Sequence, residues 1–132
     1  MSAPARGLHH VEIWVSDLEL DSWAWLLEEL GFEVVGEWVG GKSWGVDATY
    51  LTLTTSPNVS AADHDRRRPG VNHLAFWGGT RSEVDALMAA APRHGWRRLY
   101  DARYPHAGGP DHYAGWVENS AGFKVEIVAE RI

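Results

Sequence analysis

Hydrophobic residues recur along this chain with two different spacings, and each spacing predicts one type of secondary structure. In two segments they return every three or four residues, which predicts helices with a single apolar stripe. The positions are Trp23, Leu26, Leu27 and Leu30 in the first segment and Val84, Leu87, Met88 and Ala91 in the second. Elsewhere apolar and polar residues alternate, which predicts strands at about residues 33–39, 42–46, 49–55, 96–100, 112–118 and 124–128.

The chain also repeats part of itself. Residues Gly7–Trp14 align with Gly70–Trp77 at a constant offset of 63 positions, with glycine, histidine and tryptophan matched identically. After each copy, a Ser/Thr-x-x-Glu sequence that begins at Ser16 or Thr80 predicts a helix start closed by a capping box. Because the same order of elements follows each copy, the sequence predicts two related half-domains.

These elements predict an α+β fold built from two βαβββ modules. Residues 1–132 are expected to form one domain, with a first module at about 7–56, a polar linker at 57–69 and a second module at about 70–129. Strands with one apolar face pack on the helices through that face. We therefore expect mixed sheets that curl around a cavity, with the helices on the outer face.

Composition narrows the range of partners. With 132 residues, of which 45% are hydrophobic and 23% charged, the chain has the make-up of a folded globular domain. The formal net charge of −6 disfavours nucleic acid, which binds clustered lysine and arginine. The sequence shows neither a membrane-spanning apolar run nor a signal peptide, so we expect a cytoplasmic protein without membrane contact. The absence of cysteine excludes thiolate catalysis and zinc–thiolate sites.

Residue alternation assigns the side chains of each strand to two faces. In the four clearest strands one parity is apolar and is expected to pack on the helices: Val11, Ile13, Val15, Leu51, Leu53, Leu74, Phe76, Val125 and Ile127. The other parity is mostly polar or aromatic and is expected to face the cavity: His10, Glu12, Trp14, Tyr50, Thr52, Thr54, His73, Ala75, Trp77, Lys124, Glu126 and Val128. This second face is where we expect function.

On the cavity face, two histidines occupy equivalent positions of the repeats and a carboxylate stands on the last strand. His10, His73 and Glu126 form a two-histidine, one-carboxylate set, which binds divalent metals and leaves coordination positions open. We expect one divalent ion, such as Fe, Mn, Zn or Ni. The alternative is that the three are hydrogen-bonded polar residues without a metal.

Three stretches give the chain a resemblance to a known superfamily. They are His10–Leu18 leading into a helix that ends at Leu30-Gly31-Phe32, then Asn72–Phe76, and finally Asn119–Val128. In order and spacing they resemble the vicinal oxygen chelate superfamily, which includes glyoxalase I, extradiol dioxygenases, fosfomycin resistance enzymes and bleomycin resistance proteins. The resemblance covers about residues 8–129. It implies metal ligands at His10, His73 and Glu126, and a homodimer in which two chains can complete one site.

The chain departs from particular branches of that superfamily at two positions. Thr52 stands where glyoxalase I-like members place a further carboxylate ligand, and Glu12 stands where fosfomycin-type enzymes have a threonine. The resemblance therefore implies the superfamily and leaves the substrate open.

Further residues are candidates for proton transfer and substrate binding. Glu12 shares the cavity face with His10, while His112 and Tyr113 end a turn-rich segment at the start of a strand, so each could move a proton. Tryptophans offer large flat contact surfaces, although core packing would also explain them. The candidates for substrate binding are Trp14, Trp44, Thr52, Trp77 and Trp116.

Two functions from different classes fit these observations. The first is a metal-dependent enzyme of the glyoxalase or dioxygenase type, acting on a small molecule that chelates the metal through vicinal oxygens. Isomerisation, lyase, group-transfer and ring-cleavage reactions all stay open. The second is a metal-free protein that gives drug or antibiotic resistance by sequestering a flat or aromatic molecule, as bleomycin resistance proteins do. Eight tryptophans and an acidic balance suit this second function.

Overall fold

The computed structural model describes residues 6–130 as eight strands, two α-helices and three short 3-10 helices. The first module contains β1 (His10–Trp14), η1 (Asp17–Glu19), α1 (Leu20–Glu29), β2 (Glu33–Trp38), β3 (Gly41–Val46) and β4 (Thr49–Thr54). The second contains β5 (Leu74–Gly79), α2 (Arg81–Ala90), η2 (Ala91–His94), β6 (Trp96–Leu99), η3 (Asp101–Arg103), β7 (Ala114–Asn119) and β8 (Lys124–Ala129).

Each module forms its own four-stranded mixed sheet. The strand orders are β1-β4-β3-β2 and β5-β8-β7-β6, with β1 parallel to β4, β5 parallel to β8, and the other neighbours antiparallel. The βαβββ pattern therefore occurs twice, which confirms the α+β fold class. The two sheets do not close on one another within the chain, so β1 and β5 are both edge strands.

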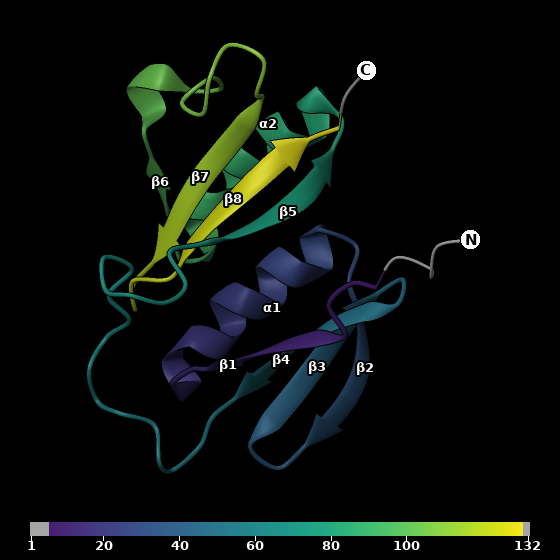
Figure 1. The fold of residues 1–132 in the computed structure, drawn as a ribbon, viewed down its shortest axis with the longest axis vertical. Coiled ribbons are helices and arrows are strands. Elements are labelled where there is room, and N and C mark those ends of the chain that lie inside the picture. The colour runs from purple at the N-terminus through teal and green to yellow at the C-terminus, as the bar shows by residue number, and fades with distance from the viewer. Residues whose placement is uncertain (1–5, 131–132) are drawn as a thin grey trace.

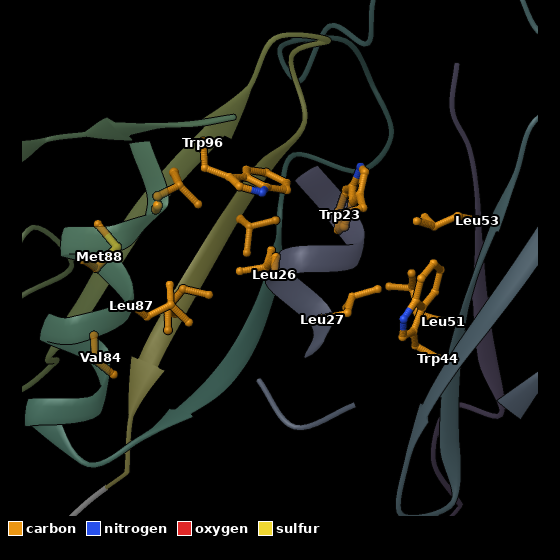
Figure 2. Packing of buried hydrophobic residues seen from close by; sticks show 14 of the residues in the cluster. Trp23, Leu26, Leu27, Trp44, Leu51, Leu53, Val84, Leu87, Met88 and Trp96 are labelled. Atoms are coloured by element: carbon orange, nitrogen blue, oxygen red, sulfur yellow. The ribbon is translucent and has the colours of Figure 1, made fainter. Parts of the chain in front are cut away.

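Helix α1 lies between the two sheets (Figure 1). On one side Leu27 points toward Trp44 of β3, and on the other Leu26 points toward Trp96 of β6 (Figure 2). The rings of Trp23 and Trp96 meet edge to face, with centroids 5.1 Å apart. One cluster of buried apolar side chains thus runs through both modules.

The two expected capping boxes have different outcomes. Thr80 accepts a hydrogen bond from the backbone N–H of Glu83, and the Glu83 carboxylate accepts one from the Thr80 N–H, which confirms the capping box at α2. The expected box at Ser16 is wrong, because its side chain makes no cap hydrogen bond and the 3-10 turn η1 precedes α1. Within the described part of the chain, no helix is long and apolar enough to cross a bilayer.

Candidate functional site

The open face of the second sheet brings His73 and Glu126 together. His73 stands directly before β5, and Glu126 lies in the middle of β8, where Ala75 is its neighbour on β5. Nε2 of His73 lies 3.2 Å from Oε1 of Glu126, and the glutamate is only 6% exposed. Two ligands at right angles on one divalent ion are about 3 Å apart, so this spacing fits adjacent positions of a metal centre.

Asn72 sets the orientation of the His73 ring. The Asn72 side-chain amide donates Nδ2–H to the carbonyl of Arg66 at 3.0 Å, which turns its oxygen Oδ1 toward His73. That oxygen lies 2.7 Å from Nδ1 of His73 and accepts a hydrogen bond from the Nδ1–H group. In the neutral ring Nε2 then keeps its lone pair and presents it to the Glu126 carboxylate, the arrangement that a cation between the two would stabilise.

His112 and Tyr113 point to opposite sides of the second sheet. Nε2 of His112 is hydrogen-bonded to the second oxygen of Glu126, so His112 belongs to the same cluster. The Tyr113 hydroxyl instead donates to Asp85 of α2 at 2.7 Å, and this bond raises the pKa of Tyr113. The Tyr113 hydroxyl thus lies on the helix side of the sheet, away from Glu126, because adjacent residues of an extended segment face opposite ways.

The open face of the first sheet carries the other expected polar residues. His10 stacks on Tyr50, with ring centroids 4.7 Å apart and planes within 3°. The carboxylate of Glu12 accepts hydrogen bonds from the Trp14 indole at 2.7 Å and from the Thr54 hydroxyl at 3.2 Å. The remaining expected residue, Thr52, is buried and shares a hydrogen bond of 2.6 Å with Ser43 of β3.

The tryptophans divide between site and core. The ring of Trp116 lies 5.0 Å from that of His73, and its indole N–H is buried without a hydrogen-bond partner among the described residues. Trp14 and Trp77 are 45% and 72% exposed. Trp44 is 1% exposed and packs beneath α1, which places it in the core.

A cavity of about 310 Å³ lies between β1 and the segment that leads into β5, and Glu12, Trp14, His73 and Lys124 are among its lining residues. His10 does not line it. Among residues 6–130, no group of three or more His, Cys, Asp or Glu side chains is placed to hold a metal ion. Within one chain, His73 and Glu126 therefore lie together at the second sheet, whereas His10 lies on the first sheet.

The sequence placed Lys124 on this face without assigning it a role, and it did not point to Tyr100 at all. Lys124 shares its parity with Glu126, so the alternation that selected Glu126 could also have selected the lysine. Its ammonium donates to the Tyr100 hydroxyl at 2.9 Å, and this hydrogen bond, with the charges of Lys124 and Arg66, lowers the pKa of Tyr100. Tyr100 has a positive φ of 59° outside any strand, and no periodicity in the sequence predicts where its ring lies.

The two βαβββ sheets, with histidines at repeat-equivalent positions, define a class of protein. Comparison with known families identifies this class. Residues 9–116 match the model of the glyoxalase/bleomycin resistance protein/dioxygenase superfamily. The chain belongs to this superfamily.

Individual relatives span almost the whole chain. The uncharacterized protein YqjT of Bacillus subtilis is 39% identical over 125 residues, which cover 92% of this chain and 98% of that protein. The crystal structure of a candidate glyoxalase from Bacillus halodurans is 44% identical, with a TM-score of 0.84, covering 93% of this chain and 95% of its own.

A more distant structure shares the fold. It is a glutamate-to-glutamine mutant of the fosfomycin resistance protein FosX of Listeria monocytogenes, in complex with Mn(II) and 1S,2S-dihydroxypropylphosphonic acid. FosX is 17% identical, with a TM-score of 0.69, and the match covers 98% of this chain and 94% of FosX.

Proposed function

We propose that this protein is a metal-dependent enzyme of the glyoxalase or dioxygenase type, which acts on a small molecule that chelates the metal through vicinal oxygens. The observation that supports it most is the His73–Glu126 pair. Nε2 of His73 and a buried carboxylate oxygen of Glu126 face each other at 3.2 Å, and Asn72 orients the ring through its other nitrogen. Fe, Mn, Zn and Ni all accept such a donor set.

The third ligand of the proposed site is His10 of a second copy of the chain. Within one chain His10 does not join the other two ligands. β1 and β5 are edge strands, and each carries an exposed tryptophan, Trp14 or Trp77, that a partner sheet would cover. A homodimer that places the open face of β1 against the open face of the partner's second sheet would supply two imidazoles and one carboxylate to each site.

The side chains around the pair have separate tasks. A bound divalent ion supplies Lewis-acid chemistry to the substrate oxygens. His112 holds the second oxygen of Glu126 and so keeps the first directed at His73. Glu12, with Trp14 and Thr54 donating to it, is a carboxylate held in position to accept a substrate proton. Trp116 gives the substrate a flat wall beside His73.

Complementation tests both the metal and the shared site. His10→Ala and Glu126→Ala are each expected to lose bound Zn²⁺ in calorimetry. When the two variants are mixed and allowed to exchange subunits, half of the dimers are mixed, and each has one intact site. Zn²⁺ binding should therefore return to about a quarter of the wild-type capacity. A wild-type chain that binds none of the four metals contradicts the enzyme proposal, and no recovery on mixing contradicts the shared site.

The second candidate function is sequestration of a flat cationic molecule without a metal. The observation in its favour is the Trp14–Glu12 contact, in which an exposed aromatic ring lies beside a carboxylate. Under this function, quenching of tryptophan fluorescence by a planar cation such as ethidium persists in His10→Ala and is lost in Trp14→Ala.

A further inference from the structure

Lys124 is a buried ammonium group that has no carboxylate partner among the described residues. Its side chain lies on the open face of β8, two positions before Glu126, and the residue is only 9% exposed. Of its three N–H donors, one is used by the Tyr100 hydroxyl at 2.9 Å. Burial of a charge is costly unless the charge is paired, so the two further donors call for acceptors from outside the chain.

The carboxylate directly opposite Lys124 on the neighbouring strand is already engaged. Glu118 is the cross-strand neighbour of Lys124 in the β7–β8 register. Its two oxygens accept from Arg66 at 2.8 Å and from Arg97 at 2.6 Å. Glu118 is thereby turned toward the arginines, and Lys124 is left with two aromatic rings, which lie 4.8 Å and 4.9 Å from its nitrogen and belong to Trp116 and Tyr100.

The lysine also stands beside the proposed metal site. Lys124 and His73 line the same cavity of about 310 Å³, and the Trp116 ring contacts both of them. The indole N–H of Trp116 is also buried without a hydrogen-bond partner among the described residues, although Trp116 does not itself line the cavity. The chain as a whole has a net charge of −6, whereas Lys124 places a positive charge at this position.

We propose that Lys124 is an anion-binding residue, and that the substrate carries a carboxylate or phosphonate group which pairs with its ammonium while the vicinal oxygens lie at His73 and Glu126. The substrate half of this statement rests on the proposed function, whereas anion binding by Lys124 does not. Tyr100 and Trp116 hold the ammonium in place between their rings. The anionic group would give Lys124 the counter-charge that the chain itself does not provide.

The chain offers a direct measurement, because Lys42 and Lys124 are its only lysines. Protein labelled with ¹⁵N at the lysine side chains should give two ammonium signals in NMR spectra. Acetate and methylphosphonate are the probes for the two anion classes, and acetamide is the neutral control for acetate. We expect an anion to shift the Lys124 signal and leave that of Lys42 in place, with acetamide without effect. The anion that binds more tightly identifies the class.

Variants test the same site by calorimetry. Lys124→Met should weaken binding of the preferred anion by about tenfold or more, Lys124→Arg should restore most of it, and Lys42→Met should leave it unchanged. All titrations are run with and without Zn²⁺. If the wild-type protein does not bind Zn²⁺ but an anion still shifts the Lys124 signal, the result contradicts the proposed metal-dependent function and leaves anion binding by Lys124 intact. An unmoved Lys124 signal in the wild-type protein at saturating anion, with or without Zn²⁺, overturns the present proposal even if Lys124→Met fails to fold.

Discussion

The side-chain oxygen of Asn72 lies 2.7 Å from Nδ1 of His73, on the side of the ring away from Glu126. The neighbouring residue in the chain thus decides which nitrogen of the proposed ligand keeps its lone pair. Partners of this kind fix both the tautomer and the direction of a metal-binding imidazole.

Replacement of Asn72 should therefore weaken metal binding without removing a ligand. Asn72→Leu is expected to lower Zn²⁺ affinity by about 10- to 100-fold, measured by competition with a chelator. Asn58→Leu, at an exposed turn position, is the matched control and should bind as wild type. Equal affinities in Asn72→Leu and the control would show that His73 is oriented by something else.

Tyr113 should behave as a structural residue. Its hydroxyl donates to Asp85 of α2, so Tyr113→Phe removes one exposed hydrogen bond and should lower the free energy of unfolding by about 0.5–1.5 kcal/mol. Zn²⁺ affinity should stay within about twofold of wild type, whereas His112→Phe should reduce it by about tenfold through Glu126. Urea denaturation measures the change in stability and calorimetry the change in Zn²⁺ affinity. A large loss of Zn²⁺ affinity in Tyr113→Phe would show that Tyr113 does belong to the site.

Trp44 and Trp77 should give opposite results when truncated. Trp44 is enclosed by the core, so Trp44→Ala should lower the free energy of unfolding by about 3–5 kcal/mol. Trp77 is 72% exposed, and Trp77→Ala should change the stability of the isolated chain by less than about 0.5 kcal/mol while weakening self-association. Urea denaturation measures the first quantity and analytical ultracentrifugation the second. Unaltered self-association in Trp77→Ala would show that the second copy of the chain does not bind over Trp77.

Local signals in the sequence predicted most of the fold. The strand alternation depends on neighbouring residues and predicted the elements, and the repeat at an offset of 63 positions showed that they form two βαβββ modules. Ser16 shows where such a signal fails, since a capping motif does not exclude a 3-10 turn ahead of the helix.

The candidate site was predictable only in part. Alternation placed His73 and Glu126 on one face of the sheet. The positions of Tyr113 and Trp44, however, depend on contacts with segments that are distant in the sequence. Tyr113 faces α2 because its hydroxyl donates a hydrogen bond to Asp85, which is 28 residues away in the sequence. Trp44 packs under α1 because its neighbour Ser43 takes the open face to reach Thr52. Periodicity within one strand does not include either contact.

The linker is held to the second sheet by Glu118, and this contact predicts a pH dependence of stability. Burial alone would raise the pKa of Glu118, but the hydrogen bonds and charges of Arg66 and Arg97 outweigh it and lower the pKa. A carboxyl group with a lowered pKa in the folded state stabilises the protein above its unfolded-state pKa of about 4.3. That contribution is lost as the pH falls toward the folded-state pKa.

Glu118→Gln tests this dependence. At pH 7 the variant should be less stable than wild type by about 1–3 kcal/mol, because Arg66 and Arg97 lose a charged acceptor. The difference should persist down to about pH 5, shrink as the pH falls through about 4.3, and disappear once Glu118 is protonated in both states. Urea denaturation of both proteins between pH 3 and pH 7 measures it. A difference that does not vary with pH would mean that Glu118 stabilises the linker by packing and not by its charge.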